Sequence, residues 1–197
     1  YLERGPEAVR TIENISEIKF VLAGAPDYHS SRQGGVDNGR ALSPAPYDGR
    51  RLGKDFDLIA DPIRVVLGGM MITSSEIKHF LNPLKSTSAL IHVLRRVGRF
   101  AKDRLKYSRG TEFSGGNALL AAAVNSLRKS GVDLRTNSPM KGLIVENGRA
   151  IGATVVIGGS EKRVLATGGV ILATGGFAAN EDLRAEIGAK HRHDVTL

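Results

Sequence analysis

The sequence predicts an α/β fold, because aliphatic strands alternate with helices and one strand opens through glycines into a helix. Val170-Ile171-Leu172 is a short aliphatic run that ends in Ala173-Thr174-Gly175-Gly176. Small residues at the end of a buried strand let the backbone approach another group closely. Asn180 follows as an expected N-cap for a helix that begins at Glu181. A strand that leads through glycines to a helix N-terminus is a common way to receive a phosphate-bearing cofactor.

An antiparallel meander is predicted before this strand. Three strands are expected, at 141–146, 150–157 and 162–166. Asn147-Gly148 tolerates positive φ and is a strong hairpin signal, and Gly158-Gly159-Ser160 suits the second turn. A further strand is expected at 132–136, parallel and next to 169–174, because the whole meander can serve as the crossover between parallel neighbours.

The N-terminal part is predicted as one helix, one strand and a long irregular stretch. Pro6 suits the first turn of a helix that runs to Ile15. The alternation of Ile18, Phe20 and Leu22 then indicates a strand. Residues 25–61 are rich in Gly, Pro, Ser and Asp and weak in periodicity. An irregular stretch of this length is expected to cover a site.

Three helices are expected in the middle of the chain. The first begins at Ser74 or Ser75 and ends at Leu81, and the third runs over 117–130, where Gly131 closes it. The second, at 86–106, is amphipathic, with apolar positions at three- and four-residue spacing and a solvated basic face. The apolar positions are Leu90, Leu94, Val97, Ala101 and Leu105, and the basic residues of this region are Arg95, Arg96, Arg99, Lys102, Arg104, Lys106 and Arg109.

Composition excludes several classes of function. The 197 residues include no Cys, so a thiolate nucleophile, a disulfide framework and a Cys-ligated metal are excluded, and the five His lack metal-ligand spacing. We therefore expect no metal site. The longest apolar runs are too short for a transmembrane segment. The absence of Cys fits a cytoplasmic protein. The net charge of +8 invites a nucleic-acid interpretation, but no interleaved aromatic residues or zinc-finger pattern accompany it, so no nucleic acid is expected.

The order of these elements resembles a family of flavoproteins. Residues 136–144, 148–152 and 170–177 together resemble the fumarate reductase and succinate dehydrogenase superfamily. Dispersed motifs resemble its 3-ketosteroid dehydrogenase-like branch, and the similarity extends from about Tyr1 to Arg184. These motifs are Pro26-Asp27-Tyr28-His29, Gly39-Arg40-Ala41-Leu42, Asp48-Gly49-Arg50-Arg51-Leu52-Gly53, Tyr107 and Gly115-Gly116-Asn117-Ala118-Leu119.

The resemblance implies FAD as the cofactor and a glutathione-reductase-like FAD-binding domain with its β-meander. Residues 1–17 and 111–197 would form part of that discontinuous domain, and 18–110 an inserted cap or catalytic domain of α+β type. The family's Gly-x-Gly-x-x-Gly turn, which holds the FAD pyrophosphate, does not occur in this sequence. We therefore expect an internal fragment of a longer enzyme. By itself the fragment should bind no FAD tightly, be inactive and tend to self-associate.

The resemblance also implies site residues. Ala173, Thr174, Gly175 and Gly176 would contact FAD, and Met140 matches the position whose backbone meets the adenine edge. Gly115, Gly116 and Asn117 open a helix whose N-terminus would face the flavin or a substrate carbonyl. The alternatives are a tight β-to-α turn at the first site and close helix–sheet packing at the last.

Two catalytic residues are proposed from the same comparison. Tyr107 precedes the two glycines as a catalytic tyrosine does in ketosteroid dehydrogenases, although four more residues separate it from Gly115 here, and an ordinary half-buried tyrosine is the alternative. Arg109, like Arg50-Arg51, would bind a carboxylate if the substrate is an acid, and the alternative is that these arginines are solvated or bridged to loop carbonyls. Tyr28 and His29 would line the inner surface of the cap.

The expected activity of the parent protein is FAD-dependent oxidation or reduction of a CH–CH bond beside a carbonyl, with a steroid-like ketone as substrate. A fumarate reductase-like protein that acts on a dicarboxylate is one alternative. A non-catalytic basic module whose helix 86–106 binds acidic partners is another. A position of 169–174 outside a sheet is expected to contradict the superfamily assignment.

Overall fold

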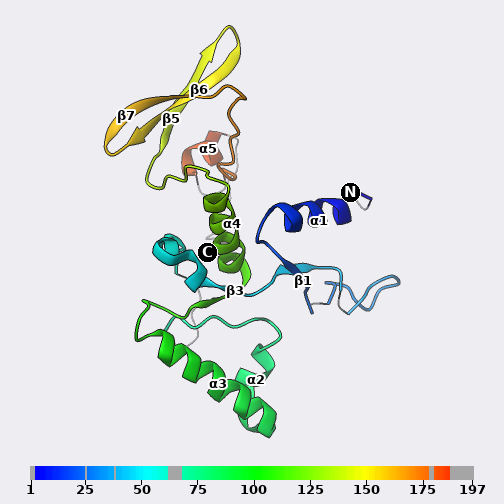
Figure 1. Ribbon diagram of the computed structural model, residues 1–197. Coiled ribbons are helices and arrows are strands. Elements are labelled where there is room, and N and C mark those ends of the chain that lie inside the picture. The colour runs from blue at the N-terminus through cyan, green and yellow to red at the C-terminus, as the bar shows by residue number, and fades with distance from the viewer. Residues whose placement is uncertain (1–2, 25, 38, 62–67, 178–179, 187–197) are drawn as a thin grey trace. The chain divides into compact units, whose positions relative to one another are not determined.

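A computed structural model describes residues 3–24, 26–37, 39–61, 68–177 and 180–186. The chain divides into two compact units, Tyr1–Asp133 and Leu134–Leu197. Figure 1 gives the order of their elements along the chain. Each unit is described by itself.

The first unit begins with the predicted helix and strand. Helix α1 spans Gly5–Ile15, with Pro6 in its first turn, and strand β1 spans Phe20–Leu22. Strand β1 pairs antiparallel with β2 (Leu42–Pro44), with Leu22 opposite Leu42. A second ribbon pairs β3 (Tyr47–Asp48) with β4 (Glu112–Phe113), so these two segments meet although they lie far apart in sequence.

The prediction that 25–61 is irregular is wrong for its second half. This half contains β2, β3 and the 3-10 helix η1 (Gly49–Leu58), whose backbone is kinked at Gly53 with φ of 56°. It also supplies buried core residues, namely Tyr47, Leu52, Phe56 and Ile59. Leu52, Phe56 and Ile59 have the i, i+4, i+7 spacing of one helix face, a signal that the prediction overlooked, whereas Tyr47 is ordered by packing on distant residues and leaves no local pattern.

Helix α4 (Gly115–Lys129) is the centre of the core. Its buried face consists of Ala118, Ala121 and Ala122, at the spacing of one helix face. Phe113, which is fully buried, lies in the same cluster and packs on Phe56 with ring centroids 5.4 Å apart. Alanine side chains are short, so the strands and η1 approach the helix backbone closely. Gly131, with φ of 73°, closes the helix as predicted.

Helices α2 (Ile77–Leu81) and α3 (Thr87–Asp103) are joined by the 3-10 turn η2 (Pro83–Lys85) and pack on each other. Both helices are predicted correctly, but the buried face of α3 is not. Leu94 and Leu105, expected in the core, are 61% and 87% exposed. The buried residues of α3 are instead Ala89 and Asp103, whose carboxylate accepts hydrogen bonds from the Thr111 backbone N–H (3.0 Å) and hydroxyl (2.6 Å).

Arg96 explains why the buried face of α3 differs from the predicted apolar face. Its side chain is only 11% exposed and forms ion pairs with Glu76 (2.9 Å) and Glu112 (2.5 Å). It also donates to the Met71 carbonyl (2.8 Å). These partners come from segments before and after the helix, so an inward arginine cannot be recognised from the periodicity of the helix alone.

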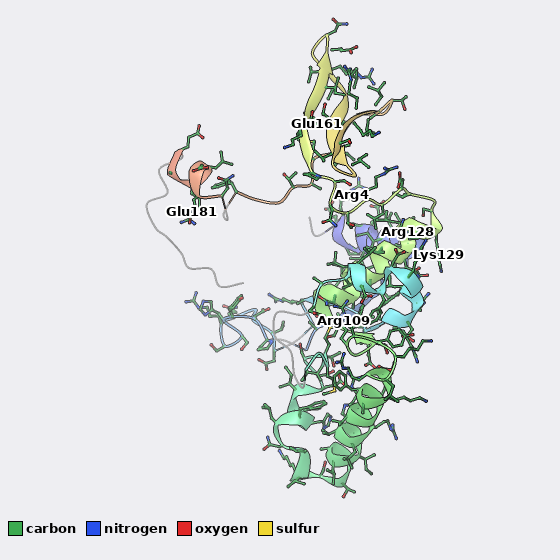
Figure 2. All side chains as sticks on the ribbon, turned by 90° about the vertical axis from the view of Figure 1, so that its left-hand side faces the viewer. Arg4, Arg109, Arg128, Lys129, Glu161 and Glu181 are labelled. Atoms are coloured by element: carbon green, nitrogen blue, oxygen red, sulfur yellow. The ribbon has the colours of Figure 1, made fainter. Side chains whose placement is uncertain are left out.

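A largely buried carboxylate, Glu17, connects the segment before β1 to the core. Glu17 accepts hydrogen bonds from the Tyr47 hydroxyl (2.5 Å) and from the Asn125 amide (2.8 Å). It also pairs with Arg51 (2.8 Å) and with Lys129, which lies beside Arg128 at the end of α4 (Figure 2).

Burial raises the pKa of Glu17. The hydrogen bonds from Lys129, Tyr47 and Asn125 and the charge of Arg51 outweigh that effect and lower the pKa to about 2. Burial and the hydrogen bond to Glu17 raise the pKa of Tyr47 to about 12. The carboxylate is therefore charged and the phenol protonated throughout the neutral range.

The second unit contains the predicted meander. Strands β5 (Met140–Glu146), β6 (Arg149–Ile157) and β7 (Ser160–Leu165) form an antiparallel sheet in the order β5-β6-β7. Asn147 and Gly148 both have positive φ in the first turn, as predicted. The Asn180 side chain accepts a hydrogen bond from the Leu183 backbone N–H (3.0 Å), which confirms the predicted N-cap of α5 (Glu181–Glu186).

The predicted parallel strands at 132–136 and 169–174 are wrong. Neither segment is in a strand, and Ile171 is 93% exposed. A strand exists only when a neighbour satisfies its N–H and C=O groups, and within the described ranges these two segments do not pair. Strand-forming residues are thus present without the sheet that they were expected to join.

Within residues 3–186, apart from the gaps named above, no helix is long and apolar enough to cross a membrane. The same ranges contain no cluster of His, Cys, Asp or Glu suited to a metal ion.

We expect Glu17 to make the stability of the first unit depend on pH. Because its folded pKa is about 2 and its ordinary value 4.5, the stabilisation is complete above pH 4.5 and is lost as the pH falls toward 2. Urea unfolding at stepped pH measures this loss. Glu17→Gln should be less stable at neutral pH and should show a smaller fall, because Asp48 and Glu76 also have lowered pKa values, whereas Glu7→Gln, an exposed control, should retain the full fall. Equal acid profiles for the parent chain and Glu17→Gln would contradict the assignment.

Candidate functional site

A cleft of about 310 Å³ lies in the first unit, beside the start of α4. Its aliphatic side comes from β1 and β2 and its hydroxyl-rich side from the segment before α2. No described lining residue carries a charged side chain. The lining residues are Val21, Leu22, Ala23, Gly24, Ser43, Pro44, Pro46, Ile72, Thr73, Ser74, Ser75, Ser114 and Gly115.

Local hydrogen bonds fix the hydroxyl-rich wall. The Glu76 carboxylate accepts from the Thr73 backbone N–H (2.8 Å) and hydroxyl (2.9 Å), which closes the turn over 73–76. The Ser114 hydroxyl donates to the Ile72 carbonyl (3.2 Å) and so ties this turn to the start of α4. Burial raises the pKa of Glu76. The hydrogen bonds from Thr73 and the charge of Arg96 outweigh this effect and bring the pKa below its usual range.

The start of α4 faces the cleft through Gly115. This residue has φ of 55°, and α4 has no side-chain cap because the Ser114 hydroxyl is directed to Ile72. The first N–H groups of a helix have no acceptor within the helix. Gly115 and Gly116 are exposed, whereas the Asn117 amide donates to the Ala60 carbonyl (2.8 Å). Of the three predicted residues, only Gly115 lines the cleft.

Tyr107 lies outside the cleft lining. Its ring is half-buried and packs on Phe56 with centroids 5.0 Å apart, and the Lys106 ammonium lies 5.8 Å from its centre. In this arrangement the tyrosine extends the aromatic core of η1.

Arg109 is buried rather than presented to the cleft. Its guanidinium pairs with Asp61 and donates to the carbonyls of Phe56 (3.1 Å) and Ile59. It also lies 5.2 Å and 5.3 Å from the ring centres of Phe56 and Phe113. Figure 2 labels Arg109 within the first unit. The arginine therefore fixes the end of η1 to the segment before β4.

The other arginines proposed for a carboxylate are also occupied. Arg50 pairs with Asp48 (2.5 Å) and Arg51 with Glu17 (2.8 Å). Tyr28 is fully exposed in the loop before β2.

The remaining predicted cofactor residues belong to the second unit. Met140 begins β5 opposite Val155 and is partly exposed. Ala173, Thr174, Gly175 and Gly176 form an exposed segment without regular structure, in which Gly175 has φ of 79°. Open space surrounds Gly175 and Gly176, so their backbone is accessible to a flat group.

Sequence reasoning missed most of the cleft wall. Thr73, Ser114 and the hairpin β1–β2 were not singled out, although they form the walls. One signal existed for the first of them, because Thr73 and Glu76 have the spacing of a capping box. The pairing of Ser114 with Ile72 is long-range and leaves no local pattern.

Comparison with known proteins gives matches over almost the whole chain. The profile of the "FAD binding domain" family matches residues 1–197. The 4-oxocyclohex-2-ene-1-carboxylate 5-dehydrogenase of Sinomonas cyclohexanicum is 34% identical over 188 residues, which is 93% of this chain and 32% of that protein. The 3-oxosteroid 1-dehydrogenase of Mycolicibacterium smegmatis is 32% identical over 192 residues, 94% of this chain and 33% of that protein.

A solved structure agrees with these matches. The crystal structure of 3-ketosteroid Δ1-dehydrogenase from Sterolibacterium denitrificans, in complex with 1,4-androstadiene-3,17-dione, superposes with a TM-score of 0.78 at 28% identity. The superposition covers 94% of this chain and 35% of that one. The chain thus spans about a third of the length of the proteins it matches. The predicted superfamily is confirmed. The expectation that 169–174 must lie in a sheet for this assignment to hold was wrong, because the segment forms no strand here.

We expect Arg109→Ala to destabilise the first unit by about 2 to 4 kcal/mol, because it leaves buried carbonyls without donors. Chemical unfolding followed by circular dichroism measures the loss. Arg104→Ala, which removes an exposed arginine nearby, should change stability by less than about 0.5 kcal/mol. A near-neutral Arg109→Ala would contradict this structural role of the arginine.

Two adjacent glycines give a matched test of the start of α4. Gly115→Ala should lower the free energy of unfolding by about 1 to 2 kcal/mol, because Gly115 has a left-handed φ. A Cβ would meet no neighbour there, so the cost comes from the backbone alone. Gly116→Ala should be neutral or stabilising by up to about 1 kcal/mol, because its φ is not positive and its surroundings are open. Thermal unfolding of the two variants measures the difference, and equal effects would contradict the described backbone.

Proposed function

This chain belongs to the FAD-binding domain family, and on that premise we propose that it is part of an FAD-dependent dehydrogenase that acts on a CH–CH bond beside a ketone. The matched relatives are dehydrogenases of 3-oxosteroids and of an oxocyclohexene carboxylate. A ring ketone is common to both substrate names.

The uncharged lining of the cleft is the observation that carries the proposal. Val21, Leu22 and Ile72 offer apolar contact to a hydrocarbon ring, and hydroxyl groups such as those of Ser43 and Ser114 supply polarity without charge. A dicarboxylate needs cationic partners in such a site. Arg50, Arg51 and Arg109, the arginines considered for that task, all have partners elsewhere. A neutral ketone is therefore favoured over a dicarboxylate.

The cleft also supports the proposed division into domains. Its walls at 21–24, 43–46 and 72–75 belong to the proposed cap, 18–110, and its floor at Ser114 and Gly115 to the proposed FAD-binding part. A substrate in this cleft would lie where the two parts meet within the first unit. The unpaired N–H groups at the start of α4 would polarise the carbonyl oxygen of the substrate.

For the cofactor, the residues present fit the family role. The accessible backbone of Thr174, Gly175 and Gly176 and the start of β5 at Met140 would hold FAD. FAD would supply the hydride acceptor. We propose no cleft contact for Tyr107 and a structural rather than catalytic role for Arg109, because of their positions on the aromatic core.

The β1–β2 hairpin offers a matched pair of variants. Leu22 lines the cleft, whereas its partner Leu42 does not, and both side chains are exposed. In the flavin-loaded parent enzyme of which this chain is a part, Leu22→Asp should raise KM for a 3-oxosteroid by about tenfold or more, because a carboxylate replaces apolar contact. Leu42→Asp should leave KM unchanged.

Steady-state kinetics with a 3-oxosteroid, together with anaerobic bleaching of the flavin, measures these effects. The oxosteroid should bleach the flavin and succinate should not. Bleaching by succinate, or equal KM changes for the two variants, would contradict the proposal.

A further inference from the structure

The turn between α2 and α3 presents apolar side chains to solvent. Leu81, at the end of α2, is 73% exposed, and Leu84, in η2, is 84% exposed. Ile77 lies one turn before Leu81 on the same face of α2, and Ile91 and Leu94 share a face of α3. All five are exposed. Figure 1 shows α2 and α3 side by side, joined by this turn.

A cation follows several of these apolar residues directly. Lys78 follows Ile77, Lys85 follows Leu84, and Arg95 follows Leu94. We call these three cations and the five apolar residues the hairpin surface. Within the described part of the chain, none of the three cations forms an ion pair, whereas Arg96 and Arg99 on the same helix share Glu112.

The charge of the whole chain is concentrated here. Residues 77–109 contain nine Lys or Arg and one acidic residue, Asp103, which is buried and bound to Thr111. Three of the nine, Arg96, Arg99 and Arg109, form ion pairs with Glu76, Glu112 and Asp61, and the other six form none within the described residues. Exposed aliphatic side chains with adjacent long cations are the composition that inserts into the headgroup region of an anionic bilayer.

We propose that the hairpin surface docks on a membrane that contains anionic phospholipids, with Leu81 and Leu84 in the acyl boundary and the cations at the phosphates. Long Lys and Arg side chains can extend to the headgroups while their stems cover apolar surface. A nucleic acid would use the charge but not the exposed leucines, and the surface has no aromatic side chain for base stacking.

The location of this surface has a consequence for substrate supply. The cleft wall at 72–75 directly precedes α2, so docking would bring the cleft close to the bilayer. Neutral ring ketones concentrate in membranes. This last step rests on the proposed function, but the docking itself does not.

Co-sedimentation with vesicles tests the docking without flavin or substrate. The chain should bind vesicles of phosphatidylcholine with phosphatidylserine, and bind phosphatidylcholine alone far more weakly. Raising the salt from about 0.1 M to about 1 M should release it. Lys78→Gln/Lys85→Gln/Arg95→Gln should weaken binding to the mixed vesicles about a hundredfold.

The leucines separate docking from simple charge attraction. Leu81→Ser/Leu84→Ser should weaken binding by about tenfold or more, whereas Leu120→Ser, an exposed leucine on α4, should leave it unchanged. Circular dichroism verifies that each variant is folded.

Three results would overturn the proposal. They are vesicle binding that ignores the leucine pair, tighter binding to duplex DNA than to the mixed vesicles, and a dimer in sedimentation that Leu81→Ser/Leu84→Ser abolishes while vesicles are not bound. None of these results bears on the cleft, so the proposed function stands or falls separately.

Discussion

The close packing of α4 against Phe113 is the contact on which the first unit depends. Three alanines let β3, β4 and η1 reach the helix, and each of these elements is too short to be stable alone. Fully buried aromatic and small residues interlock at crystal-like density, so larger side chains at the alanine positions would force the elements apart. The shape of the cleft depends on this packing, because the first turn of the same helix forms its floor.

The polar contacts of the unit act as ties between segments that are distant in sequence. Glu17 connects β1 to α4, Arg109 connects η1 to β4, and Arg96 connects α3 to the segments on either side of it. In each case a charged group lies at low exposure and is matched by several partners, which offsets the cost of its burial. Sequence reasoning assigned Arg96 to solvent, and for Arg109 it offered bridging to loop carbonyls, which the structure shows, beside a ligand role, but the partners of a charged residue cannot be identified from its own segment.

Features that depend on neighbours in sequence were predictable. The meander follows from Asn147-Gly148, α5 from its N-cap at Asn180, and the end of α4 from Gly131. Features that depend on distant segments were not. Strand β3 gains its position from the distant β4 and α4, and 169–174 has strand-forming residues but no described partner. For the site, Gly115 was predictable from its glycine pair, whereas the walls at 21–24 and 72–75 meet it only through tertiary contacts.

Pro44 and Pro46 leave one stretch of the cleft lining without free backbone hydrogen-bond donors. Neither residue has a backbone N–H, and the N–H of Ala45 between them is already bound to the Lys19 carbonyl (2.8 Å). The stretch 44–46 therefore offers no free backbone donor, whereas the floor of the cleft begins with the N–H groups of α4, which have no side-chain cap. A ligand with one carbonyl end would meet backbone donors at the floor and none along 44–46, so the backbone alone would favour one orientation in the cleft.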